Sequence, residues 1–165
     1  GWESPHTEAD MRVRCRGLDY PLQPLTIRQN APRHNIVWLV CESLRADAID
    51  PEIMPKTHAF ASGEALWFRR CYSAGDGTRM GMFGLFYGLH GSYWFPALRA
   101  NRGPVLIDVL RRAGYQFDCR TSQSFTYPEF DRTVFVDVPS ASLHAISGGA
   151  PGWQRDRQNV GQMLR

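Results

Sequence analysis

The chain has 165 residues, of which 43% are hydrophobic and 12% aromatic, so it can bury a sizeable core and is not expected to be disordered. The formal net charge is +3, and nearly all of the positive charge is arginine, because Lys56 is the single lysine. The planar guanidinium of arginine can donate two hydrogen bonds at once to a phosphate or sulfate group. The same preference for arginine can follow from the base composition of the gene, so charge alone does not identify a partner. We expect no nucleic-acid partner.

The cysteines and the apolar runs argue against two further classes. The longest unbroken apolar stretch, 36–41, is far shorter than the roughly 20 residues that cross a bilayer, and no signal peptide opens the chain. We therefore expect this piece to be soluble. The four cysteines are widely spaced and form no C-x-x-C pair, which argues against a zinc finger; they are Cys15, Cys41, Cys71 and Cys119.

Residues 1–33 mix charges with several prolines and show no sustained period, which indicates an irregular linker or lead-in. The domain proper is expected to occupy 34–165. It opens with 35–41, a continuous β-branched and apolar run that is typical of a parallel strand covered on both faces. This run ends abruptly at the polar Glu42.

The next segments predict a helix, an extended segment and a second helix. Residues 55–62 resemble a short helix closed by Gly63, and 65–72 contains two short apolar runs that favour an extended backbone. The loop 73–77 then leads into 78–89, which is apolar nearly all round and is expected to be a buried helix. Its three glycines each cost about 1 kcal/mol of helix propensity relative to alanine, so they indicate a neighbour pressed against the backbone.

The remaining segments complete an α/β pattern. Apolar residues at helical spacing predict an amphipathic helix over 105–113, which a glycine at Gly114 ends. Residues 115–119 and 133–138 predict two more strands, and 154–165 predicts a helix. Strands that alternate with helices imply right-handed crossovers, so the expected fold class is α/β with a mostly parallel sheet and helices on both faces.

Glu42 is the first candidate site residue, because ligands of open α/β sheets collect at the carboxyl ends of the strands. A carboxylate directly after a buried strand is costly unless it is paired, hydrogen-bonded or metal-bound. Glu42 is therefore either a metal ligand or a structural glutamate that caps a helix or meets Arg45. Its position alone does not separate the two interpretations.

The loop before the 78–89 helix is the second candidate site. Backbone N–H groups of a glycine-bearing loop, which includes Gly77, and the positive end of the helix would form an anion site that contains the Thr78 hydroxyl. The alternative, that Thr78 is an ordinary N-cap, is favoured by the local pattern alone. Arg79 could add a charged fork or point to solvent. His90 is the histidine near this site, although a lone histidine is more often structural than a ligand.

Together, Glu42 and Thr78 indicate a specific chemistry. A carboxylate and a helix-start hydroxyl at neighbouring strand ends are what metal-assisted attack on phosphorus or sulfur requires. In this interpretation Glu42 and Thr78 hold the metal, Thr78 is the nucleophile, and the substrate contacts come from Gly77, Arg79 and His90.

These segments resemble the sulfatase and alkaline-phosphatase superfamily. The stretch 35–47 looks like its opening strand and metal-ligand motif, and 54–61 resembles the helix that follows. The stretch 72–79 resembles the nucleophile segment, and 85–89 is similar to the family's "LLTGL" helix. The resemblance runs from about residue 34 to residue 160, so residues 34–165 would be the N-terminal part of a sulfatase-like α/β domain.

The residues at the metal-ligand and nucleophile positions indicate which branch of this superfamily the chain resembles. Ordinary sulfatases place an aspartate pair after the strand and a formylglycine precursor at the nucleophile position, where this chain has Glu42 and Thr78. That combination resembles the envelope branch of lipoteichoic acid synthases and phosphoethanolamine transferases. The stretches 85–89 and 91–96 are similar to the YejM/PbgA-type inner-membrane sulfatase-like proteins of Gram-negative bacteria, which are linked to lipopolysaccharide and phospholipid balance.

The resemblance implies a divalent metal (Mn²⁺, Mg²⁺ or Zn²⁺) and a phosphate or sulfate ester substrate, with a lipid ester as one candidate. It also implies a location at the periplasmic face of the bacterial inner membrane, with attachment through segments not in this chain. The family completes its metal site with later aspartate and histidine ligands, and 140–165 has no Asp-His motif and a single histidine, His144. The remaining ligands are therefore expected outside this chain, which would be a fragment with an incomplete alkaline-phosphatase-like fold.

Two other classes of function stay open. One is a catalytically degenerate sulfatase-like domain that binds lipid or a partner protein and regulates envelope lipid balance. The other is a plain α/β binding domain.

Overall fold

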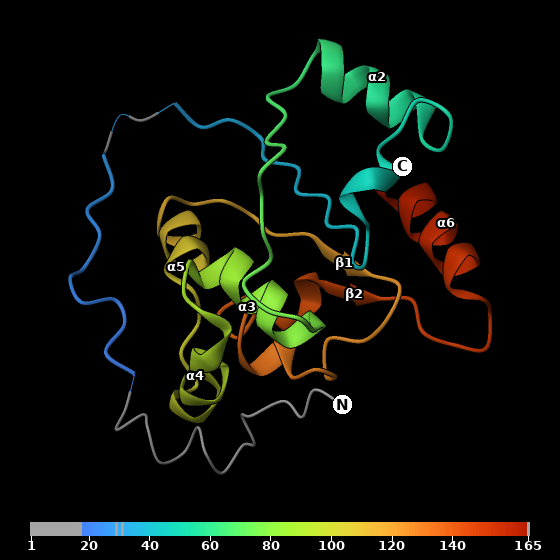
Figure 1. The fold of residues 1–165 in the computed structure, drawn as a ribbon. Helices are drawn as coiled ribbons and strands as arrows, with labels where there is room; N and C mark the ends of the chain where they lie inside the picture. Colours follow the sequence, from blue (N-terminus) through green and yellow to red (C-terminus); the bar gives the residue numbers. More distant parts are fainter. Residues whose placement is uncertain (1–17, 29, 31, 165) are drawn as a thin grey trace, which may run out of the picture. The chain divides into compact units, whose positions relative to one another are not determined.

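The computed structural model describes residues 18–28, 30 and 32–164, which fall into two compact units (Figure 1). One unit combines the described lead-in, 18–28, with 74–164, and the other contains 30–73. The described residues form five α-helices and one two-stranded parallel sheet. The chain is therefore of mixed α/β structure, in agreement with the expected class at this level.

The unit 30–73 contains the 3-10 helix η1 (Ala46–Ala48) and the helix α2 (Pro55–Gly63). Proline begins α2 at a position where a backbone N–H is not needed, and Glu64 N–H closes the helix on the Phe60 carbonyl at 2.9 Å. The predicted helix 55–62 is thus confirmed. None of its residues is buried.

The run 35–41 is not a strand in this structure. No strand is assigned to it, and its apolar side chains are exposed, with Leu39 at 76%. The segment 65–72 likewise contains no strand, and Leu66, Phe68 and Tyr72 are exposed. The strand prediction for 35–41 is therefore wrong, because a strand needs a neighbouring strand for its backbone hydrogen bonds, and an apolar run does not supply one.

In the larger unit, α3 (Thr78–Tyr87) packs against α4 (Trp94–Ala100) and α5 (Val105–Arg112), and the 3-10 helix η2 (Gly91–Tyr93) joins α3 to α4. The predicted helix 78–89 ends two residues early, because Gly88 adopts a left-handed conformation with φ 66°. Its burial is one-sided: Phe83, Phe86 and Tyr87 are buried while Leu85 is exposed. The predicted helix 105–113 is confirmed.

Aromatic side chains form the core of the larger unit. Phe83 stacks on Tyr87 with ring centroids 4.0 Å apart. Trp94, which is completely buried, meets Phe83 and Phe130 edge to face at 6.1 and 5.8 Å. Such aromatic pairs contribute about 0.5–1.5 kcal/mol each beyond the area they bury. The core therefore fixes α3 and α4 against the segment that contains Phe130.

The sheet consists of β1 (Cys119–Thr121) and β2 (Leu143–Ala145), which pair in parallel with Cys119 opposite Leu143. The helix α6 (Gly152–Met163) packs on β1. Arg155 of α6 stabilises this arrangement by donating hydrogen bonds to the carbonyls of Ser122, Gly148 and Ala150. The predicted C-terminal helix is thus confirmed. The predicted strand 115–119 overlaps β1 only at Cys119.

The segment 133–138 forms turns instead of the predicted strand. Its β-branched residues are buried as expected, with Val134 completely covered and Val138 nearly so. The backbone bonds are local, however: Phe135 N–H donates to the Phe130 carbonyl at 2.8 Å, and Val138 N–H to the Phe135 carbonyl at 2.9 Å. Local turn bonds therefore satisfy the groups that a neighbouring strand would have paired.

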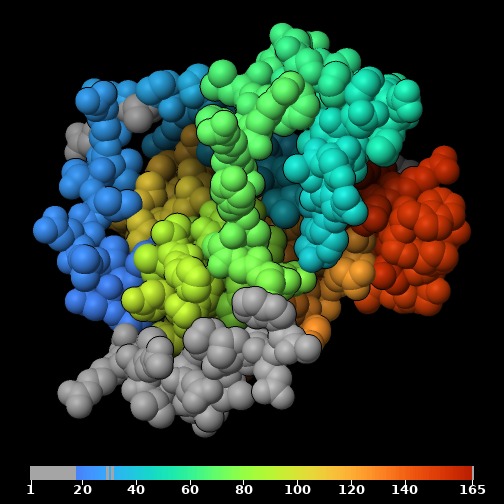
Figure 2. Space-filling model, in the orientation of Figure 1, coloured from blue at the N-terminus to red at the C-terminus, as the bar shows by residue number. Residues whose placement is uncertain are grey.

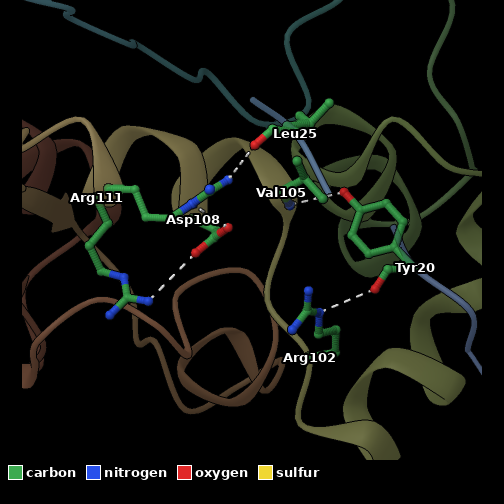
Figure 3. Close-up of polar contacts among 7 residues, drawn as sticks. Tyr20, Leu25, Arg102, Val105, Asp108 and Arg111 are labelled. Atoms are coloured by element: carbon green, nitrogen blue, oxygen red, sulfur yellow. Dashed lines mark hydrogen bonds and ion pairs between the residues drawn. The ribbon is translucent and has the colours of Figure 1, made fainter. Parts of the chain in front are cut away.

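The lead-in residues lie along α4 and α5, where the dark blue segment meets the yellow-green one (Figure 2). Tyr20 anchors this segment, because its hydroxyl donates to the Tyr87 carbonyl at 3.1 Å. The same hydroxyl accepts from Val105 N–H at 3.0 Å (Figure 3). Arg102 donates to the Tyr20 carbonyl, and Arg112 donates to the Leu25 carbonyl. Burial raises the pKa of the Tyr20 hydroxyl, so it stays protonated and keeps both bonds at neutral pH.

We expect Tyr20→Phe to lower the free energy of unfolding by about 1–2 kcal/mol, because it removes both bonds and leaves the Val105 N–H unsatisfied at the first turn of α5. Urea denaturation would measure the change. Tyr127→Phe is the matched control, since Tyr127 is 74% exposed. Equal stability of the two variants would contradict the anchoring role of Tyr20.

Candidate functional site

The helix start that carries Thr78 is formed by a tight glycine loop. Gly77 is the N-cap of α3, and the first bond of the helix runs from Gly81 N–H to the Gly77 carbonyl at 2.9 Å. Thr78 is therefore the first helical residue, and the alternative that it is the N-cap is wrong. Its side chain is exposed. The backbone N–H groups of 78–80 precede the helical bonds and point from the positive end of the α3 dipole.

Glycines let the backbone approach α3 closely at this point. A Cβ added to Gly75 or Gly91 would overlap Met80, and a Cβ added to Gly84 would overlap Ala74. The loop before α3 and the segment after it therefore enclose the first turn of the helix. The prediction that glycines mark a neighbour pressed against this helix is confirmed at Gly84.

Arg79 contacts a carboxylate that the sequence patterns do not indicate. Its Nε donates to Glu129 Oε2 at 3.2 Å and its Nη2 donates to Glu129 Oε1 at 3.0 Å, across a separation of 50 residues. The guanidinium also lies 5.6 Å from the ring centre of Tyr127 and 6.0 Å from that of Trp94. Arg79 therefore does not simply point to solvent, and Glu129 is a new member of this neighbourhood.

His90 has a local structural contact. It is the N-cap of η2, where its Nδ1 accepts from Ser92 N–H at 3.3 Å and lies 3.0 Å from Ser92 Oγ. The side chain is exposed. This capping bond accounts for a histidine at this position without a ligand, and a substrate role for His90 stays a prediction.

Glu42 belongs to the other unit, 30–73, whereas Gly77, Thr78, Arg79 and His90 belong to the larger one. It lies in a turn after the exposed run 35–41, and its side chain is exposed. The neighbouring Arg45 pairs with Asp47, with Nε donating to Oδ1 at 2.9 Å. A metal-ligand role for Glu42 therefore also stays a prediction.

Glu42 and Thr78, taken one by one, have donor atoms that suit a hard cation. Glu42 offers a carboxylate and Thr78 a hydroxyl, the oxygen donors that Mg²⁺ and Mn²⁺ prefer. In the described residues, no group of three histidine, cysteine, aspartate or glutamate side chains could hold a metal ion. The donor chemistry of each residue therefore fits such a metal, and a metal site that includes both stays a prediction.

The late histidine and Cys119 lie on the sheet. His144 is a β2 residue, and its Nε2 lies 3.6 Å from an Asp118 carboxylate oxygen that also meets Arg120 Nε at 3.0 Å. Burial, with a smaller contribution from Asp118, raises the pKa of the Cys119 thiol to about 11. The thiol is therefore protonated at neutral pH and is a poor nucleophile.

The sequence is similar to bacterial inner-membrane proteins. It is 28% identical over 138 residues, 82% of this chain, to the proteins called "Inner membrane protein YejM" in Salmonella typhimurium and in Salmonella typhi. It is 34% identical over 131 residues, 79% of this chain, to an uncharacterized protein of Haemophilus influenzae. These matches bear out the resemblance to YejM-type proteins.

The matched part spans only 22–23% of the length of these relatives. No family model matches the sequence, and no solved structure matches it. Within the part of the chain that the structure describes, no helix combines the length and the apolar character that crossing a membrane requires.

Proposed function

We propose that the chain carries the N-terminal part of a metal-dependent hydrolase or phosphotransferase domain of the sulfatase and alkaline-phosphatase type. Its substrate would be a phosphate or sulfate ester of the cell envelope, with a lipid ester as one candidate. The parallel strands β1 and β2 would belong to a larger parallel sheet with helices on both faces. The similarity to proteins named as inner-membrane proteins supports an envelope location, which we place on the periplasmic face.

The start of α3 is the observation that carries this proposal. Thr78 is an exposed residue with a side-chain hydroxyl, and it is the first residue of a ten-residue helix that follows a glycine loop. The helix dipole and the backbone N–H groups of the first turn favour an anion at this place. A hydroxyl beside bound phosphate or sulfate is positioned to attack it.

Each candidate residue has a role in the proposed reaction. Thr78 Oγ1 would attack phosphorus or sulfur, and the ester oxygen would leave on the opposite side. The backbone at Gly77 and the guanidinium of Arg79 would hold the anionic oxygens, with His90 at the edge of the site. Glu42 and Thr78 would bind Mn²⁺, Mg²⁺ or Zn²⁺, which would lower the pKa of the hydroxyl and stabilise the developing charge.

A second candidate function is a degenerate domain that binds lipid or a partner protein and regulates envelope lipid balance. In this alternative the pair of Arg79 and Glu129 is a structural ion pair that joins α3 to the turn at Glu129. Under this alternative, Thr78→Ala would leave the cellular function of the protein intact.

The proposal predicts that the complete gene product hydrolyses or transfers a phosphate or sulfate ester only with divalent metal present. Glu42→Gln keeps the size of the side chain but removes its charge, so we expect metal affinity to fall at least about ten-fold. Calorimetric titration with Mn²⁺ would measure this. Glu64→Gln, at an exposed position after α2, is the control and should bind as the wild type does.

Activity that survives chelation of divalent metals would contradict the proposal. Equal metal affinity of the Glu42→Gln and Glu64→Gln variants would remove Glu42 from the ligand set.

A further inference from the structure

The pair of Arg79 and Glu129 has a defined geometry. Glu129 takes the side-on edge of the guanidinium, where Nε and Nη2 donate at 3.2 and 3.0 Å, and this pairing does not use Nη1. Both side chains are about one-third exposed, at 32% for Arg79 and 28% for Glu129. A two-bond contact of this kind fixes the orientation of the guanidinium plane as well as its position.

Two aromatic rings lie near the guanidinium of Arg79. The Arg79 Cζ is 6.0 Å from the ring centre of Trp94, which is completely buried, and 5.6 Å from that of the exposed Tyr127. These separations are at the outer range of cation–π attraction, so the rings add little energy. The directional bonds that orient the guanidinium therefore come from Glu129.

Glu129 is itself held in place by the core. The hydroxyl of the completely buried Thr133 donates to the Glu129 carbonyl at 2.7 Å. The next residue, Phe130, is buried against Trp94, and Asp131 N–H donates to the Phe125 carbonyl at 3.0 Å. The backbone at Glu129 is therefore fixed, and its carboxylate meets Arg79 from a constant direction.

We infer that Glu129 is a positioning residue for Arg79. It holds the side-on edge of the guanidinium and leaves the Nη1 end for an oxygen of a tetrahedral anion, phosphate or sulfate, beside the first turn of α3. This inference rests on the proposed function, because it takes the anion site at Thr78 as given. Under this inference, Glu129 strengthens anion binding although it is itself negatively charged, because it orients the guanidinium of Arg79.

The experiment titrates the complete gene product with inorganic phosphate and with inorganic sulfate. Glu129→Gln keeps an acceptor of the same size but loses the charge, so we expect phosphate to bind about ten-fold more weakly. Glu52→Gln is the control, because it removes one exposed negative charge from the unit 30–73. Unchanged or tighter phosphate binding by Glu129→Gln would overturn the inference, and tighter binding would make Glu129 a competitor of the anion.

A second measurement separates this inference from the proposed function. The Nε–H signal of Arg79 in ¹⁵N-labelled protein, assigned with Arg79→Lys, reports the order of the guanidinium whether or not anions bind. We expect a resolved signal in the wild type and a loss of that signal in Glu129→Gln, at an unchanged melting temperature. An unchanged Arg79 signal would overturn the positioning role, whereas a wild type with an ordered Arg79 that binds no phosphate or sulfate would overturn the proposed function.

Discussion

Thr78→Ala should abolish metal-dependent turnover, with a loss of at least about 10³-fold in kcat/KM, because it removes the proposed nucleophile. The structure predicts little cost to folding. Thr78 is exposed at the first position of α3, and the helix begins from the Gly77 backbone rather than from a threonine side chain. Thermal melting and ester hydrolysis, measured on the same preparation of the complete gene product, would test both statements.

Two variants control this experiment. Thr78→Ser keeps a hydroxyl at the same place, so we expect it to retain part of the activity. Thr57→Ala makes the same alanine change in the first turn of α2, where the side chain is also exposed, and should be neutral. Turnover by Thr78→Ala equal to that of Thr57→Ala would rule out Thr78 as the nucleophile and would favour the non-catalytic alternative.

The helices α2, α3, α5 and α6 could be predicted from the sequence because their signals are local, whereas α4 was not predicted. Proline at Pro55, glycine at Gly114 and the apolar period of 105–112 all act within a few residues of the helix they define. Strands depend instead on a distant partner. The β-branched residues of 133–138 are buried as a strand would be, yet their backbone bonds close locally, and the pairing of Cys119 with Leu143 has no comparable local signal.

The same distinction applies to the candidate site. The glycine loop and the position of Thr78 at a helix start are short-range features, and the sequence predicts them. Glu129 was missed because its link to Arg79 spans 50 residues and depends on how the turn before Phe130 packs on Trp94. A lone glutamate beside a proline and a phenylalanine carries no pattern that indicates such a pair.

The largest expected loss of stability follows Trp94→Ala. Trp94 is completely buried at the start of α4, where its ring meets Phe83 of α3 and Phe130 of the segment between β1 and β2. Replacing it with alanine removes both ring contacts and leaves a cavity, so we expect unfolding to require about 3–5 kcal/mol less free energy. Against a typical total of about 5–15 kcal/mol, this change would unfold a large share of the molecules under mild denaturant.

Trp153→Ala is the matched control, since the same atoms are removed from a tryptophan of α6 that is 63% exposed. We expect its effect to stay within about 0.5 kcal/mol. Trp94→Phe should fall between the two, because it keeps an aromatic ring and removes an indole N–H that is buried and has no hydrogen-bond partner in the described structure. Equal stability of Trp94→Ala and Trp153→Ala in urea denaturation would contradict the central place of Trp94 in the core. It would also contradict the packing of Phe130 on Trp94 that positions Glu129 for its bonds to Arg79.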